Sequence, residues 1–135
     1  MILTSISFTV NAQDRKIPIE FVPKQITAYL KTHFPDNTVL KATFDNHVIY
    51  KKYKISLNDK ISLEFSPDYK VMEIKSKSKL PNSVIPEGIQ KYVETNYPKN
   101  VITDWELDNG NQQIELDNGI DIEFNLKGVF IRIKN

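Results

Sequence analysis

The chain has 135 residues, of which 40% are hydrophobic and 26% charged, a length and composition typical of one compact globular unit. Its net charge is only +1, so the overall electrostatic field favours neither nucleic acid nor an anionic membrane as a partner. The chain contains no cysteine, which excludes disulfides, thiolate metal sites and thiol nucleophiles.

The first element in chain order is an uncharged, mostly apolar run over residues 2–10, which is followed by Val10-Asn11-Ala12. Such small residues after an apolar run are typical of a signal-peptidase site, so residues 1–12 are predicted to be a signal peptide. No Lys or Arg precedes the run, which is consistent with a truncated signal peptide. The prediction places the mature protein in the periplasm or outside the cell. The alternative is an N-terminal edge strand, because the run is rich in β-prone residues. Nothing else approaches the length of a membrane span.

The remainder of the chain contains two copies of one sequence unit. Residues 22–37 align with residues 85–100, and the two segments share proline, isoleucine, tyrosine, asparagine and an aromatic-proline pair. Later segments align at an offset that is shorter by four residues, so a deletion falls in the first hairpin of the second copy. These later matches are residues 55–65 with 114–124 and residues 71–75 with 130–134.

The repeat divides the chain into domains. We predict repeat 1 over residues 13–75, a linker rich in Ser and Lys over residues 76–84, and repeat 2 over residues 85–135.

Each copy is expected to start with a short amphipathic helix. A proline opens the segment at Pro23 or Pro86, where its missing N–H costs nothing, and Pro35 or Pro98 stops it. Apolar residues at helical spacing form one stripe in each helix. The stripes are Ile26, Tyr29, Leu30 and Phe34 in the first copy, and Ile89, Tyr92, Val93 and Tyr97 in the second.

Strict alternation of apolar and polar residues follows each helix and predicts four antiparallel strands per copy with one apolar face. Asn118-Gly119 between two alternating runs is a strong hairpin signal, and Asp59-Lys60 is its weaker counterpart. The predicted fold is therefore α+β, with two helix-plus-four-stranded units forming one continuous curved sheet and helices packed on one face.

The helix ending in Phe34-Pro35 or Tyr97-Pro98, followed by Leu57 to Phe65 or Leu116 to Phe124, resembles the PepSY-like, beta-lactamase-inhibitor-like family. The resemblance covers almost the whole mature chain, twice. It implies an exported protein with the fold of a beta-lactamase inhibitor, which acts by binding rather than turnover. It carries no catalytic residues to transfer, and inhibition of a beta-lactamase would be an extrapolation from shape alone.

The histidines and serines of the sequence agree with that implication. Of the two histidines, His33 lies near the end of the first helix and His47 in a predicted turn, and neither has a counterpart in the second copy. A catalytic base needs an orienting partner and a nucleophile, and the serines lack the setting of a nucleophile elbow. We predict no enzyme activity, no cofactor and no metal site.

Charge is distributed unequally between the copies. Residues 13–79 carry thirteen basic and eight acidic side chains, whereas residues 80–135 carry five and nine, which gives net charges of +5 and −4. Charged residues that alternate with the apolar set are expected on the open face of the sheet, where such asymmetry would orient a protein partner. An ordinary solvated face is the alternative. The charged residues assigned to this candidate face are Lys52, Lys54, Glu115, Asp121 and Glu123.

Three larger side chains complete the predicted binding surface. If Met72 and Ile131 face the helices, Val71 and Phe130 point to the open face, and Tyr50 is out of phase with the inward residues of its strand. Cross-strand pairing that only stabilises the sheet is the alternative role for these residues. Trp105 is expected to point inward.

The predicted function is a non-catalytic exported protein- or peptide-binding module, inhibitory or modulatory, that uses the open sheet face. The partner is expected to be a protein or peptide of the cell envelope. The alternative is a small-ligand carrier or minor enzyme with a pocket between helices and sheet. A third possibility is strand addition at a sheet edge.

Overall fold

The computed structural model describes residues 14–134. The predicted signal peptide and its alternative, an N-terminal strand over residues 2–10, lie outside the described residues. No helix in the described part of the chain is long and apolar enough to cross a membrane.

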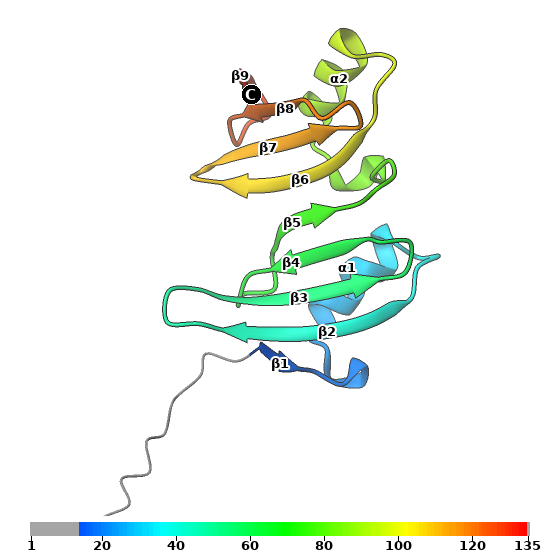
Figure 1. Cartoon of the computed structure of the whole chain (residues 1–135), viewed down its shortest axis with the longest axis vertical. Helices are drawn as coiled ribbons and strands as arrows, with labels where there is room; N and C mark the ends of the chain where they lie inside the picture. The colour runs from blue at the N-terminus through cyan, green and yellow to red at the C-terminus, as the bar shows by residue number, and fades with distance from the viewer. Residues whose placement is uncertain (1–13, 135) are drawn as a thin grey trace, which may run out of the picture.

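Over residues 14–134 the fold is α+β, with two α-helices and one nine-stranded antiparallel sheet, whose strands lie in chain order from β1 to β9 (Figure 1). Strand β1 (Asp14–Lys16) precedes a 3-10 turn (Ile19–Phe21) and the first helix. The first half continues with α1 (Lys24–His33), β2 (Val39–Asn46), β3 (Lys51–Leu57), β4 (Ser62–Phe65) and β5 (Val71–Lys75). After a second 3-10 turn (Asn82–Val84), the second half contains α2 (Glu87–Asn96), β6 (Ile102–Asp108), β7 (Asn111–Leu116), β8 (Asp121–Phe124) and β9 (Phe130–Lys134).

Each helix begins directly after a proline, Pro23 or Pro86, whose extended backbone leads into the first turn. Each ends at an aromatic residue that precedes a proline, where the following ring disfavours further helical backbone. The predicted stripes are buried at Ile26, Leu30, Ile89 and Val93.

Both helices pack on the same face of the sheet. Leu63 pairs with Ile74, Ile74 with Trp105, Trp105 with Ile114 and Ile114 with Ile122, so one row of buried side chains crosses all strands from β4 to β8. Directly opposed residues of a sheet point to the same side. Tyr29 of α1 packs edge-on against Phe65, and Tyr92 of α2 packs edge-on against Phe124 on the same side. Trp105 is thus inward, as the sequence indicates.

The two halves share one sheet because β5 pairs with β6. Glu73 lies opposite Glu106, Ile74 opposite Trp105, and Lys75 opposite Asp104. The segment between the halves is attached to β6, because Leu80 is buried and its N–H donates to the Ile102 carbonyl at 2.8 Å. The face opposite the helices is therefore continuous across the junction.

Candidate functional site

The strand register places the predicted charged residues on the face that the helices leave open. Lys54 pairs with Glu64, and Glu115 pairs with Asp121, next to the inward Ile55 and Ile122. By the same alternation Lys52 and Glu123 also lie on the open face.

The prediction that Val71 and Phe130 lie on the open face is wrong. Val71 pairs with the buried Phe65 and packs against the core. Phe130 pairs with the buried Phe124, and its ring stacks on Tyr92 of α2 with the centroids 4.8 Å apart. Both side chains therefore belong to the helix face.

The reason is a register shift in each copy. One occurs between Glu64 and Phe65 opposite β5, and the other between Glu123 and Phe124 opposite β9. A bulge inserts one extra residue into a strand and so reverses the alternation beyond it. Met72, which the sequence places inward, instead lines a groove of the open face with Lys52 and Glu73.

That groove has a volume of about 620 Å³ and lies where β5 meets β6. One wall is the loop between β2 and β3, including Tyr50, and Met72 contributes an apolar patch. Charged walls come from Lys52, Glu64, Glu73 and Glu106. A hollow of this size is in the range that holds a small ligand or a few residues of a peptide.

The loop over residues 47–50 is the most exposed apolar segment of the described chain. Ile49 exposes 94% of its surface and Val48 is fully exposed. The loop is closed by a hydrogen bond from the His47 N–H to the Tyr50 carbonyl at 2.9 Å, and the two rings pack with centroids 4.5 Å apart. A defined loop thus presents two aliphatic side chains to solvent.

The second copy has no such loop. Strands β6 and β7 are joined by the tight turn Asn109-Gly110, in which both residues have positive φ. Strands β2 and β3, with 8 and 7 residues, are each one residue longer than β6 and β7, with 7 and 6. The loop is two residues longer than the turn, so the four-residue difference between the repeats is a longer hairpin in the first copy.

Some of the charged side chains around the groove form ion pairs, and others do not. Lys52 donates to Glu64 at 3.0 Å; burial lowers the pKa of Lys52, but this hydrogen bond and the charge of Glu64 outweigh it, so the pKa is raised. Glu106 has no such partner among the described ion pairs, and burial, then the charges of Glu73 and Asp108, raise its pKa. The groove floor therefore carries two opposed carboxylates, of which Glu73 is paired with Lys75 at 3.1 Å and Glu106 is not paired within the described residues.

A second acidic row crosses the open face in repeat 2. Asp104 lies opposite Glu115, and Glu115 opposite Asp121. Burial raises the pKa of Glu115, and the charges of Asp104 and Asp121 add to the shift. Like charges in directly opposed positions destabilise a sheet, and a cationic partner would relieve that repulsion.

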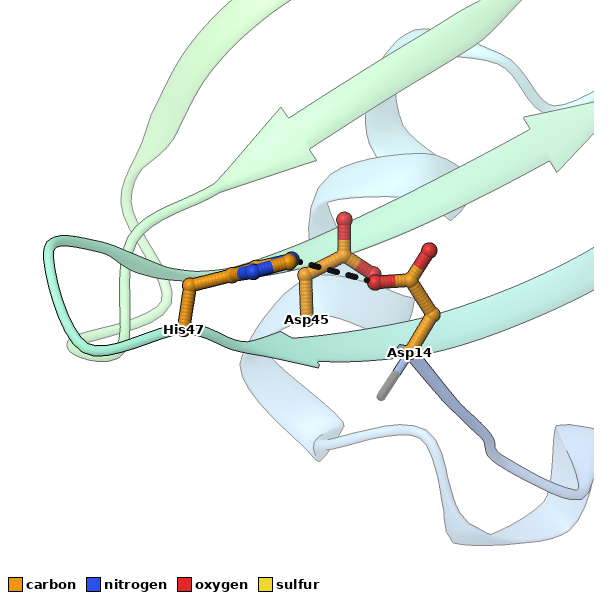
Figure 2. Close-up of side chains that lie close together, drawn as sticks. All are labelled: Asp14, Asp45 and His47. Atoms are coloured by element: carbon orange, nitrogen blue, oxygen red, sulfur yellow. Dashed lines mark hydrogen bonds and ion pairs between the residues drawn. The ribbon is translucent and has the colours of Figure 1, made fainter. Parts of the chain in front are cut away.

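Three potential metal ligands meet beside the same loop (Figure 2). Asp14 comes from β1, Asp45 from the end of β2, and His47 from the first position of the loop. The Nε2 atom of His47 lies 3.3 Å from Oδ1 of Asp14, and donor atoms of the three side chains all lie within 4.8 Å of one another.

Sequence reasoning missed several of these residues. Val48 and Ile49 directly follow His47, which the sequence places in a turn, but the signal for a longer exposed loop is the length difference between the copies. Asp45 and His47 are two positions apart, which puts them on one side of a strand, but Asp14 joins them only through β1, a three-residue strand with no apolar pattern.

Comparisons with known proteins agree with the fold. A family model described as beta-lactamase-inhibitor-like and PepSY-like matches residues 8–73 and 51–132. A periplasmic protein of Bacteroides thetaiotaomicron, proposed to be calcium-regulated, is 31% identical with a TM-score of 0.85, over 90% of this chain and 97% of that one. A periplasmic protein of Bacteroides vulgatus is 32% identical with a TM-score of 0.84, over 93% of this chain and 99% of that one.

Another periplasmic protein of Bacteroides vulgatus, of unknown function, is 23% identical with a TM-score of 0.84, over 91% of this chain and all of that one; it shows the fold alone. No curated protein matches the chain significantly. The two family matches together span both halves of the sheet and overlap within the first. The chain belongs to the PepSY-like, beta-lactamase-inhibitor-like family.

Proposed function

We propose that this protein is an exported, non-catalytic binding module that holds a peptide segment of an envelope protein in the groove of its open face. The observation that carries the proposal is the loop over residues 47–50, whose Val48 and Ile49 are exposed beside a groove of about 620 Å³. Isolated exposed aliphatic residues are common, but two adjacent ones at the rim of a groove are typical of an interaction site.

Export is supported by two observations. The apolar run of residues 2–10 and Val10-Asn11-Ala12 have the character of a signal peptide, and the similar solved structures are periplasmic proteins. We infer that the mature protein starts at Gln13 and consists of repeat 1 over residues 13–75, a linker over residues 76–84 and repeat 2 over residues 85–135.

The partner segment is expected to combine an apolar and a basic side chain. Tyr50 and Met72 offer an apolar contact, and the opposed pair Glu73 and Glu106 offers an acidic one. Fixed charges of one sign select partners of the other sign and speed their encounter. The other open-face candidates, Lys52, Lys54, Glu115, Asp121 and Glu123, would orient the rest of the partner.

The alternative, a small enzyme or ligand carrier between helix and sheet, has weaker support. The hollow beside α1 is smaller, about 360 Å³, and its walls include Leu30 and Phe34. Nδ1 of His33 lies 2.8 Å from the Ser83 hydroxyl, but no described group hydrogen-bonds to the other ring nitrogen. A serine–histidine pair without an orienting group lacks a part that nucleophilic catalysis uses.

A selection from a displayed library of random peptides tests the proposal. We expect enrichment of peptides with Lys or Arg close to an apolar residue, and the enriched peptides should bind less tightly in high salt. A variant with residues 47–50 replaced by Asn-Gly copies the tight turn of the second repeat and should lose at least about tenfold in affinity, or 1.4 kcal/mol.

The matched control is the double variant Leu126→Ser, Val129→Ser, which removes two exposed aliphatic side chains from the turn between β8 and β9. It should bind the peptides like the parent. Equal binding by the loop-exchange variant, with its thermal unfolding unchanged, would contradict the proposed site.

A further inference from the structure

Asp14, Asp45 and His47 form a compact constellation of three side chains from two neighbouring strands and the exposed loop (Figure 2). The β1–β2 register sets Asp14 directly opposite Asp45, and His47 follows two positions after Asp45. Their donor atoms all lie within 4.8 Å of one another.

The distances suit a small transition-metal ion. Zinc binds imidazole and carboxylate ligands at about 2.0–2.2 Å in tetrahedral geometry, so two of its ligand atoms lie roughly 3.3–3.5 Å apart. The separation of 3.3 Å between His47 Nε2 and Asp14 Oδ1 matches that value. The widest separation in the group, 4.8 Å or less, needs to contract by roughly 1.5 Å at most.

Asp45 supplies a reason for a cation to bind here. Its side chain is almost fully buried, at 3% exposure, and a buried carboxylate is costly unless it is paired and hydrogen-bonded. The buried Thr43 hydroxyl donates to Oδ1 at 3.2 Å, but the ammonium of Lys54 stays 3.7 Å from Oδ2 on a half-exposed side chain. Asp14 adds a second negative charge directly across the ladder.

We propose that Asp14, Asp45 and His47 bind one divalent transition-metal ion of the zinc class, with Thr43 positioning the Asp45 carboxylate. Two carboxylates and one imidazole provide three protein ligands and leave the fourth position for water. Calcium and magnesium prefer oxygen ligands alone, so the imidazole selects against them. Lys54, which has its ammonium beside Asp45, swings into solvent when the ion neutralises that carboxylate.

The ion would link β1 to the first residue of the loop over residues 47–50. Its binding would restrict the loop that carries Val48 and Ile49, so the ion becomes a regulator of peptide binding. This consequence rests on the proposed function, whereas the metal site itself does not.

Calorimetric titration of the tag-free chain with Zn²⁺ tests the site without any peptide. We expect one ion per chain and a rise in melting temperature that grows with Zn²⁺ concentration. His47→Asn and Asp45→Asn should each weaken binding by at least about tenfold, and Thr43→Val by roughly 10- to 100-fold as expected for an outer hydrogen bond to a ligand. Ca²⁺ should produce no comparable heat.

The controls are His33→Asn, which removes the other histidine, and Asp108→Asn, which alters the repeat-2 position equivalent to Asp45. Both should bind Zn²⁺ like the parent. Co²⁺ gives an independent readout, because a four-coordinate site produces intense visible absorption that His47→Asn should abolish. Unchanged Zn²⁺ binding by His47→Asn, or its loss in His33→Asn, would overturn the proposal.

Discussion

Glu73 lies directly opposite Glu106 where the two repeats join, and both carboxylates line the groove of the open face. Lys75 reaches Glu73 at 3.1 Å, whereas burial, followed by the charges of Glu73 and Asp108, raises the pKa of Glu106. The junction that joins the halves into one sheet therefore carries repulsion that a bound cationic group would relieve.

Glu106→Gln is expected to stabilise the free protein at pH 7 by roughly 0.2–1 kcal/mol, because it removes one of two opposed like charges. A carboxyl group with a raised pKa holds its proton more tightly in the folded state, so its cost to stability appears as the pH rises above its ordinary value of 4.5. The gain from the substitution should disappear below that pH. Urea unfolding of the parent and the variant at pH 4 and pH 7 measures the gain in stability and its loss at low pH.

Asp117→Asn is the control, and we expect it to change stability at pH 7 in the opposite direction, by lowering the free energy of unfolding. The side chain of Asn100 and the N–H of Val101 donate to Asp117, and these hydrogen bonds lower its pKa. Asp117 therefore contributes stability above its ordinary pKa that is lost as the pH falls through the folded value. A Glu106→Gln variant that is less stable than the parent at pH 7 would contradict the assignment of repulsion.

Phe130→Ala should lower the free energy of unfolding by about 1–3 kcal/mol, because it removes a ring that stacks on Tyr92 with planes 6° apart. Leu126→Ala, on an exposed side chain in the neighbouring turn, should change it by less than about 0.5 kcal/mol. Denaturant unfolding of the two variants measures the difference. Equal effects would mean that Phe130 does not anchor α2.

Gly88→Ala should destabilise the protein by about 1 kcal/mol even though alanine favours helix. An added Cβ at Gly88 would lie 3.0 Å from the Gly128 carbonyl oxygen, and overpacking against backbone outweighs the gain in helix propensity. Gln25→Ala at the exposed, equivalent position of α1 should have no cost. Thermal unfolding compares the two variants. A Gly88→Ala variant that is more stable than the parent would show that the turn containing Gly128 can move away from the helix.

Lys60→Gly should raise stability by roughly 1 kcal/mol. Asp59 and Lys60 both have positive φ, at 61° and 59°, which costs a residue with a side chain about 1 kcal/mol or more. The equivalent position of repeat 2 is Gly119, with φ of 84°. Thermal unfolding measures the change, with Lys60→Ala as the control that keeps the strain; an equal gain from alanine would point to charge instead.

Much of this fold could be predicted because the sequence contains two copies of the same structural unit. Prolines before and after the helices, alternating strands and a hairpin turn, Asp59-Lys60 or Asn118-Gly119, recur at matching positions, so each copy supports the interpretation of the other. Burial of Trp105 followed from its place in the alternation. These are local signals, and local signals are readable in one chain.

The side assigned to Val71 and Phe130 could not be predicted, because a bulge is one extra residue and its position depends on the partner strand. Extending strict alternation through it reversed both residues and placed Met72 inward. The Asp14–Asp45–His47 cluster depends on the pairing of β1 with β2, and the groove depends on the pairing of β5 with β6. No spacing along the chain encodes those contacts.

The proposed function requires that the loop over residues 47–50 contacts a partner in the envelope. A photo-crosslinking amino acid at Ile49, compared with one at Val129 on the exposed turn of the second repeat, tests it in living cells. We expect one discrete adduct at position 49, which is lost when Glu73 and Glu106 are both changed to Gln, and none at position 129. No adduct at position 49, or the same adduct from both positions, would contradict it.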